Sequence, residues 1–319
     1  MLDTIELAGS GRRTTRLGFG GSGLMGGLSE RGSLRLLETA YEAGIRHFDV
    51  APSYGHGAAE RCLGKFLRGK ADQVTVATKY GILPPPRTAL LGVARSMVRP
   101  LARQMPAVRR RAARAAAGLQ SKAHFTAREA ARSLERSLRE LDVGRIDLWL
   151  LHEATADDLD ESDLLPLLQT AQQDGRIGVF GVGGDRSHVD ALWRRHRDFC
   201  PVLQFDGSPL NPAPDCPGAF RIDHRVIAGA LDRIASAFER DLQLCRRWSA
   251  ELSVDLSDSG VLTALLLGTA LNSNPGGMVL FSSRTPARIR TNAQVADDPG
   301  WAARSQRFLE LFRSASPPL

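Results

Sequence analysis

Residues 46–60 read RHFDVAPSYGHGAAE, and this stretch carries the pattern on which the fold prediction depends. A short apolar strand, predicted over 45–50, contains the carboxylate of Asp49 near its end. A turn rich in proline and glycine follows, and it carries the phenol of Tyr54. Apolar residues at helical spacing then predict a helix over 58–69. The stretch therefore predicts a strand, a turn and a helix, with an acid and a phenol close to the turn.

The same alternation of a short apolar strand with an amphipathic helix recurs along the chain. The predicted strands lie at 16–20, 45–50, 73–79, 145–152, 176–184, 201–206, 224–229 and 277–283. A helix is predicted after each strand, including one long helix over 230–252, and a hairpin is predicted over 4–17. Eight such units predict an α/β fold, a (β/α)8 TIM barrel with an N-terminal β-hairpin. An open doubly wound sheet competes with it, but its usual G-x-G-x-x-G does not open a helix after the first strand.

Composition places the chain among globular proteins. It has 319 residues, of which 43% are hydrophobic and 24% charged, so a single domain over 1–319 is expected. No apolar run approaches the roughly 20 residues of a membrane span, and the first residues lack the apolar centre of a signal peptide. A cytoplasmic protein without a membrane partner is expected. The four cysteines, which form no C-x-x-C pair, are expected to be free thiols rather than disulfides or metal ligands: Cys62, Cys200, Cys216 and Cys245.

The positive charge is concentrated in one segment. The net charge is +7, and seven arginines without an acidic residue lie between Arg95 and Arg114. This segment lies in a long basic insertion over 81–125 after the third barrel strand, where a loop is expected to overhang the mouth of the active site. The segment from Arg95 to Arg114 contains no aromatic residue to stack on bases, so no nucleic-acid partner is expected. Three readings stay open: a lid for an anionic or bulky substrate, a solvated helical excursion, or a segment that binds an acidic partner or nucleic acid.

Polar side chains end several of the predicted strands, where the active sites of barrels lie. They are Asp49 with Tyr54 behind it, Lys79, His152 and Gln204. Each alone has an ordinary structural explanation, such as a helix cap or a solvated lysine, but their shared placement favours a site. An ammonium beside a phenol lowers its pKa, and a carboxylate keeps a buried ammonium charged. Asp49, Lys79 and Tyr54 are therefore predicted to form a proton-donating relay, with His152 orienting a carbonyl oxygen.

At these residues the chain resembles the aldo-keto reductase superfamily. The resemblance rests on GIRHFDVAPSYGHGAAERCLGKFL, VTVATK, SLERSLRELDVGRIDLWLLH, DGRIGVFGVGG and VLFSSRTPARIRTN, which follow one another in the family's order over nearly the whole chain. It implies a (β/α)8 barrel and a nicotinamide cofactor held without a Rossmann domain. It also implies carbonyl reduction by hydride transfer, with Tyr54 as proton donor and Asp49, Lys79 and His152 in support.

The resemblance also implies a set of cofactor contacts. Gln204 matches the amide that binds the nicotinamide carboxamide, whereas Gly183 and Gly184 stand where the family has Ser-Asn. The predicted strand over 224–229 lacks the family's stacking tyrosine, so Ala228 or Gly229 would take its place. Four residues match the site for the adenosine ribose and its phosphate: Ser283, Arg284, Arg288 and Asn292. Arginines at the start of a helix form an anion site, which favours NADPH over NADH.

The expected function is NADPH-dependent reduction of an aldehyde or ketone, or the reverse oxidation of an alcohol, with a small molecule as the only partner predicted. Two other classes stay open. One is a barrel that binds the nicotinamide cofactor but regulates a partner with little turnover, which the Gly183-Gly184 pair and the basic insertion would suit. The other is an aldolase in which Lys79 forms a Schiff base. The substrate and the oligomeric state are not predicted.

Overall fold

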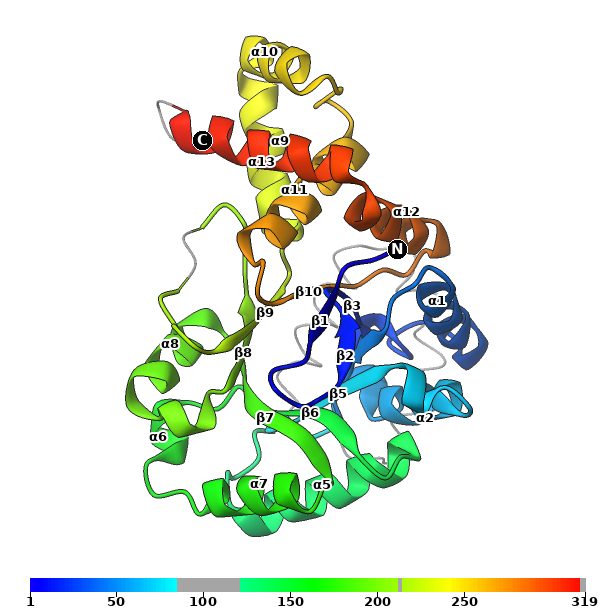
Figure 1. The fold of residues 1–319 in the computed structure, drawn as a ribbon, viewed down its shortest axis with the longest axis vertical. Coiled ribbons are helices and arrows are strands. Elements are labelled where there is room, and N and C mark those ends of the chain that lie inside the picture. Colours follow the sequence, from blue (N-terminus) through cyan, green and yellow to red (C-terminus); the bar gives the residue numbers. More distant parts are fainter. Residues whose placement is uncertain (85–120, 212–213, 316–319) are drawn as a thin grey trace.

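Eight parallel strands close into a barrel in the computed structural model, which describes residues 1–84, 121–211 and 214–315. The strands are β3 (Leu17–Gly20), β4 (His47–Asp49), β5 (Thr75–Tyr80), β6 (Ile146–His152), β7 (Ile177–Gly184), β8 (Val202–Asp206), β9 (Phe220–His224) and β10 (Met278–Phe281). Each strand pairs with its neighbour in the chain, and β10 closes the ring against β3. The predicted (β/α)8 barrel is confirmed, and Figure 1 looks along it with helices around the strands.

A hairpin of β1 (Thr4–Glu6) and β2 (Arg13–Thr15) precedes the barrel, as the sequence predicts. Leu7 is fully buried in the hydrophobic cluster that fills the barrel interior, together with Leu148 and Ile222. Thr14 contacts Thr75, the first residue of β5. The hairpin therefore lies across the amino-terminal end of the barrel and leaves the carboxyl-terminal end of the strands for the site.

The helices and short 3-10 turns surround the barrel. The helices are α1 (Glu30–Glu42), α2 (Ala59–Leu67), α5 (Ala127–Leu141), α6 (Ala156–Leu159), α7 (Leu164–Gln173), α8 (Arg186–Arg195), α9 (Ala228–Arg240), α10 (Leu242–Leu252), α11 (Ser259–Ser273), α12 (Pro286–Asp297) and α13 (Pro299–Ser314). The 3-10 turns are η1 (Gly21–Gly23), η2 (Tyr54–His56), η3 (Ala71–Gln73) and η4 (Arg197–Phe199). A second hydrophobic cluster, centred on Trp248 and Phe308, joins α9, α10, α11 and α13 at the top of Figure 1.

Helix α5 illustrates how local sequence defines an element. Thr126 caps it, because the threonine hydroxyl accepts from the backbone N–H of Glu129 at 3.4 Å. The Glu129 carboxylate accepts from the backbone N–H of His124 at 3.2 Å, two residues before the cap. One half of a capping box is therefore present, and the carboxylate satisfies a different donor nearby.

Two predicted elements differ from the structure. The seventh barrel strand is Phe220–His224 and not 224–229. The prediction missed it because its outward face carries Arg221 and Asp223, which interrupt the apolar pattern. The long helix predicted over 230–252 is broken at Asp241, whose φ of −132° and ψ of 86° leave the helical region. The Asp241 side chain caps α10 by accepting from the N–H of Leu244, and this local bond competes with a continuous helix.

The connection between β8 and β9 also departs from the prediction that a helix follows every strand. No helix occurs in its described residues, 207–211 and 214–219. Pro209, Pro214 and Pro217 remove backbone donors that a helix would need. Figure 1 shows this segment as coil at the left of the view, between α8 and the C-terminal end of α13.

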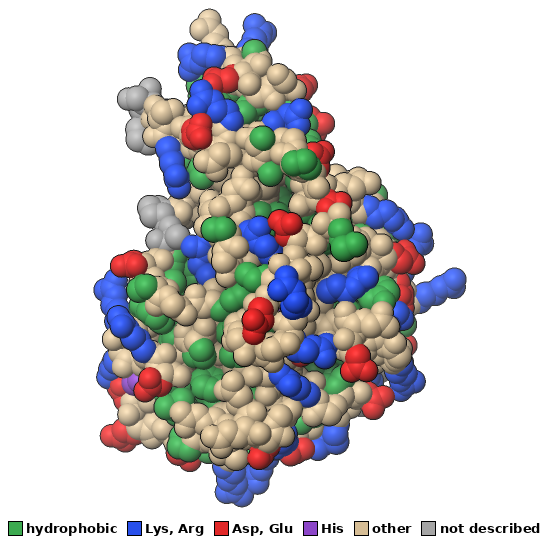
Figure 2. Space-filling view, viewed as in Figure 1, with side chains coloured by type: hydrophobic (Ala, Val, Ile, Leu, Met, Phe, Trp, Pro, Cys, Tyr) green, Lys and Arg blue, Asp and Glu red, His purple; other side chains and the backbone are tan. Residues whose placement is uncertain are grey.

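The two ends of the insertion after β5 are hydrogen-bonded to each other. Ile82 forms an antiparallel bridge with Lys122, and the N–H of Leu83 donates to the carbonyl of Ser121 at 3.0 Å. The remainder, 85–120, lies outside the described residues, and it contains all seven arginines of the basic segment. The three interpretations of the insertion therefore also concern residues outside the described ranges. On the face in Figure 2, Lys and Arg side chains are interspersed with Asp and Glu. Within the described ranges, no helix is both long and apolar enough to cross a membrane.

Candidate active site

Three neighbouring strands bring the predicted catalytic residues to one cavity. Asp49 ends β4, Lys79 is the penultimate residue of β5 and His152 ends β6. Tyr54 lies in η2, directly after β4. All four line a cavity of about 1080 Å³, as does the predicted Gln204 from β8. The carboxyl ends of parallel strands meet at one rim, and this explains why residues so distant in sequence converge.

Asp49 and Lys79 form a buried ion pair. The ammonium Nζ lies 2.5 Å from Asp49 Oδ2, and the two side chains are 2% and 5% exposed. Nζ also donates to the carbonyl of Val50 at 3.2 Å, while Gln204 Nε2 donates to the same Oδ2 at 2.8 Å. Burial acts to raise the pKa of Asp49, but the Lys79 charge and hydrogen bond hold this pKa below its usual value. The carboxylate is therefore ionised and held in place by Lys79 and Gln204.

The backbone of η2 directs Tyr54 toward His152. Gly55 has a φ of 55°, and a Cβ there would lie 2.5 Å from the Cβ of Met25 and 2.6 Å from the carbonyl of Leu24. Only glycine fits this close approach. The tyrosine ring meets the His152 imidazole edge to face, with centroids 6.3 Å apart and planes at 84°. Lys79 Nζ lies 5.8 Å from the centroid of the tyrosine ring.

The predicted lowering of the Tyr54 pKa is wrong for this structure. Burial raises the pKa of Tyr54 above its ordinary value, and the negative charge of Asp49 adds to the increase. The main physical reason is burial, which disfavours the charged phenolate, and the Lys79 charge that would oppose it is largely compensated by the carboxylate 2.5 Å away. Tyr54 is consequently a protonated phenol at neutral pH, which is the form that a proton donor needs.

His152 is a partly buried, neutral imidazole. Burial lowers its pKa to about 3, and the nearby Lys79 charge acts in the same direction. Its Nδ1 has no hydrogen-bond partner among the described residues. A neutral imidazole carries one N–H, which is suited to donate to a carbonyl oxygen near Tyr54.

The region predicted to bind the nicotinamide carboxamide is only partly as expected. Gly184 lines the cavity, whereas Gly183 is buried in β7 and does not line it. Glu153 occupies the space beside Gly184, because a Cβ at residue 184 would lie 2.7 Å from Glu153 Oε2. The same oxygen accepts from the backbone N–H of Asp185 at 3.1 Å. Sequence reasoning missed Glu153, although a carboxylate directly after the predicted histidine was a visible signal.

The other end of the cavity holds the predicted phosphate site. Ser283, Arg284, Arg288 and Asn292 all line it, around the first turns of α12. Ser283 Oγ accepts from the N–H of Thr285 at 3.1 Å and so helps to start the helix. Neither arginine forms a hydrogen bond or ion pair with any described residue. Two unpaired guanidinium groups beside a helix N-terminus can bind an anion.

The middle of the cavity contains two residues that sequence reasoning missed. His224 ends β9 and Arg225 follows it, so the position predicted for Ala228 or Gly229 belongs to His224; Ala228 instead begins α9. Burial lowers the pKa of His224 to about 4. Arg225 has a φ of 54°, a strained value for a non-glycine residue, and it has no partner among the described residues. These two residues were missed because the strand was predicted four residues too late.

Comparison with known proteins agrees with this geometry. The sequence model of the Aldo/keto reductase family matches residues 16–205, which is more than half of the chain. The chain belongs to the aldo/keto reductase family. This membership confirms the resemblance predicted from the sequence motifs.

Several relatives of this aldo/keto reductase are known. D-threo-aldose 1-dehydrogenase from a Pseudomonas species is 32% identical over 201 residues, which cover 60% of this chain and 56% of the relative. L-galactose dehydrogenase from Arabidopsis thaliana is 27% identical over 192 residues, 57% of this chain and 49% of the relative. The chain thus spans about half the length of these two curated relatives.

Solved structures share the fold along nearly the whole chain. The holo form of aldo-keto reductase AKR11C1 from Bacillus halodurans has a TM-score of 0.65 at 16% identity and covers 96% of both chains. Glycerol dehydrogenase AKR11B4 from Gluconobacter oxydans also has a TM-score of 0.65, at 18% identity, covering 99% of this chain and 97% of its own. A structure from Klebsiella pneumoniae, described as in complex with NADPH, has a TM-score of 0.63 at 16% identity over 100% of this chain and 96% of its own.

Proposed function

We propose that this protein is an NADPH-dependent oxidoreductase that reduces an aldehyde or ketone, or oxidises an alcohol in the reverse direction. One observation carries the proposal: the cavity that holds Asp49, Tyr54, Lys79 and His152 continues without a break to Arg284 and Arg288. The names of relatives support it, because they include D-threo-aldose 1-dehydrogenase and pyridoxal 4-dehydrogenase. The expected partner is a small carbonyl or alcohol substrate.

The residues along the cavity fit a nicotinamide dinucleotide phosphate. Arg284 and Arg288, which have no partner among the described residues, supply charge for the 2′-phosphate and favour NADPH over NADH. Arg225 supplies a third unpaired cation beside the N-terminus of α9, which suits the pyrophosphate. Glu153 and Gln204 can hold the carboxamide, with a carboxylate accepting from its NH2 group where the family has Ser-Asn.

The chemistry follows from the protonation states of the side chains. A bound nicotinamide would supply the hydride for the carbonyl carbon. Tyr54, held protonated by burial, donates its proton to the carbonyl oxygen, and His152 orients that oxygen with its single N–H. Lys79 acts during proton transfer, because its charge stabilises the phenolate that forms as Tyr54 loses its proton. Asp49 keeps Lys79 charged while the ammonium remains buried.

The proposed domain organisation is one unit over 1–319. Trp301 packs against both the barrel cluster and the cluster of α9, α10, α11 and α13, so the two share one apolar interior. Ile82 lines the cavity, and this supports the proposal that the insertion 81–125 begins near its mouth.

Replacing Tyr54 by phenylalanine tests the proposal. The variant should lose about 10²- to 10⁴-fold in turnover, the usual contribution of a positioned general acid. NADPH binding should change little, because the ring remains and only the hydroxyl is removed. The measurements are NADPH fluorescence titration and NADPH oxidation with a panel of aldehydes and ketones. A variant as fast as the parent on a good substrate would remove Tyr54 from the mechanism, and NADPH binding without turnover by the parent would favour the regulatory alternative.

A further inference from the structure

Glu153 is a carboxylate at the rim of the proposed active site whose charge has no assigned role. It directly follows His152, the last residue of β6, and it lines the cavity that also holds Tyr54. Its side chain is 37% exposed, so a ligand in the cavity can reach its oxygens. A charge in this position can act on whatever reacts beside Tyr54.

One oxygen of Glu153 is held by the protein, and the other is available. Oε2 accepts from the backbone N–H of Asp185 at 3.1 Å and lies 3.5 Å from His188 Nδ1. Oε2 also lies 2.7 Å from the position that a Cβ at Gly184 would take, so the glycine makes room for the carboxylate. Oε1 forms no hydrogen bond with any described residue. The side chain is therefore anchored through Oε2 and can accept from a ligand through Oε1.

The charge of Glu153 is not balanced by a nearby cation of the protein. Among the described residues, it forms no ion pair with a lysine or an arginine. The two cations of this part of the cavity face other carboxylates. Lys79 lies 2.5 Å from Asp49, and Arg225 opposes the rise in the pKa of Asp206 that burial causes. Glu153 therefore contributes a negative charge that a cationic ligand can match.

Carbonyl reduction creates such a cation on the nicotinamide ring. A hydride, which is one proton with two electrons, leaves C4 of the neutral reduced ring and bonds to the carbonyl carbon. The electrons of the carbonyl π bond move to the oxygen, which takes the Tyr54 proton. The ring is left with one positive charge and Tyr54 with one negative charge. A carboxylate beside the ring attracts the oxidised form and has no comparable attraction for the neutral reduced form.

Resting on the proposed function, we propose that Glu153 accepts from the nicotinamide carboxamide through Oε1 and that its charge stabilises the oxidised ring. The charge reaches the reacting groups, because it adds to the rise in the pKa of Tyr54 that burial and Asp49 cause, although its effect there is the smallest. Tighter binding of the oxidised form makes the bound cofactor a stronger hydride donor, since affinity and reduction potential are linked. Glu153 thus favours carbonyl reduction by stabilising the charge that develops on the ring.

The ratio of two dissociation constants tests this role without turnover. The Kd for NADPH is measured on the full chain by fluorescence titration, and the Kd for NADP⁺ by competition with NADPH at the same pH and ionic strength. Glu153→Gln keeps the size and an acceptor oxygen of the side chain but removes its charge. The ratio of the NADPH Kd to the NADP⁺ Kd should fall about tenfold in this variant, which corresponds to a rise of about 30 mV in the reduction potential of the bound couple.

Two further variants separate charge from shape and from position. Glu153→Asp keeps the charge on a shorter side chain and should keep most of the preference for NADP⁺. Asp185→Asn is the matched control, because Asp185 lines the same cavity but directs its carboxylate to Ser187 at the start of α8. This control should change the ratio by a clearly smaller factor than Glu153→Gln does.

The single-turnover rate of NADPH oxidation with a good carbonyl substrate gives a second readout. It should fall in Glu153→Gln by less than the ratio changes, because only part of the ring charge has developed in the transition state. An unchanged ratio in Glu153→Gln, or an equal change in Asp185→Asn, would overturn the role of Glu153 and leave the proposed function intact. Failure of the parent to bind either nucleotide would instead overturn the proposed function, and the role of Glu153 with it.

Discussion

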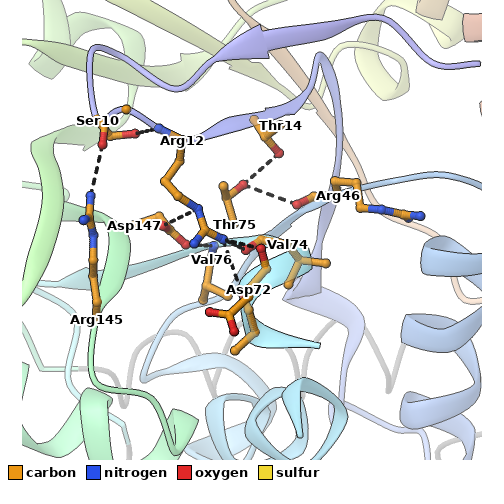
Figure 3. A network of polar contacts seen from close by, with 12 residues as sticks. Ser10, Arg12, Thr14, Arg46, Asp72, Val74, Thr75, Val76, Arg145 and Asp147 are labelled. Atoms are coloured by element: carbon orange, nitrogen blue, oxygen red, sulfur yellow. Dashed lines mark hydrogen bonds and ion pairs between the residues drawn. The ribbon is translucent and has the colours of Figure 1, made fainter. Parts of the chain in front are cut away.

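The two ends of the barrel use their arginine side chains differently. At the amino-terminal end, Arg12 donates to the carbonyls of Ala71, Asp72 and Val74 and pairs with Asp147 at 3.7 Å. Figure 3 shows this network beneath the hairpin. At the carboxyl-terminal end, Arg225, Arg284 and Arg288 have no partner among the described residues. One end satisfies its cations with the protein's own backbone, and the other leaves them available to a ligand.

The amino-terminal network joins the hairpin to the barrel through hydroxyls as well. Thr75 Oγ1 donates to Thr14 Oγ1 at 2.8 Å and contacts the ring of His47 at 2.9 Å. Arg145 donates to the carbonyl of Ser10 at 3.1 Å. Figure 3 shows that these contacts come from the hairpin, β5 and the start of β6. Such side chains stabilise the fold and have little left to offer a ligand.

Backbone strain occurs at both ends, with Ala8 of the hairpin at a φ of 47°, and two strained residues lie at the rim of the proposed active site. Glu153 and Arg225 have φ values of 57° and 54° and directly follow β6 and β9 at the rim of the proposed active site. Strain of this kind in non-glycine residues costs on the order of 1–3 kcal/mol and persists where the surrounding structure imposes it. The comparison teaches that stability and ligand binding are assigned to opposite ends of one barrel.

The largest expected effect comes from Lys79→Met, which should lower both stability and turnover at the carboxyl-terminal end of the barrel. Asp49 would remain as a buried charge with only Gln204 to bond it, so the free energy of unfolding should fall by about 3–5 kcal/mol. Turnover should fall at least about 100-fold. Urea denaturation and initial rates measure the two. The double variant Asp49→Asn/Lys79→Met should regain most of the stability without turnover, and a double variant less stable than the single one would contradict the ion-pair account.

Arg12→Ala should affect stability alone. Loss of its carbonyl contacts and of the Asp147 pair should lower the free energy of unfolding by about 2–4 kcal/mol, with turnover of the folded fraction unchanged. The matched control is Arg13→Ala in the same strand, whose exposed bonds to Thr4 should be worth less than about 1 kcal/mol. Thermal and urea denaturation compare them. An equal loss of unfolding free energy in both variants would contradict the stabilising role assigned to the Arg12 network at the amino-terminal end.

Arg288→Ala should affect ligand binding alone, and by the smallest amount. Its Kd for NADPH should rise about tenfold, as expected for one lost charge-assisted contact, while the Kd for NADH stays nearly constant. The unfolding free energy should stay within about 0.5 kcal/mol, since the side chain has no partner among the described residues. Arg290→Ala, on the same helix but outside the cavity lining, is the control. A similar change for both nucleotides would assign Arg288 a role other than binding the 2′-phosphate.

Local patterns in the sequence were sufficient for most of the barrel. Strands such as 145–152 are short apolar runs bounded by turns, and their carboxyl ends must share a rim once the barrel closes. For this reason Asp49, Lys79 and His152 were predictable as one group. Prediction failed at β9, where Arg221 and Asp223 interrupt the apolar pattern on the side away from the barrel interior.

Electrostatic properties required the tertiary structure. The sequence placed Tyr54 and Lys79 near each other, but the direction of the Tyr54 pKa depends on burial and on the distance from Lys79 to Asp49. Both quantities arise only when the strands are packed, because desolvation and Coulomb energy depend on spatial and not sequence separation.

By itself, then, the sequence determined the order of strands and helices, the family, and the residue types that meet at the stretch RHFDVAPSYGHGAAE. The tertiary structure decided which of those residues are charged and which space Glu153 occupies. The physical reason is the range of the interactions involved. Strand and helix patterns arise between residues near in sequence, whereas protonation, cavities and unpaired donors arise between residues that only folding brings together.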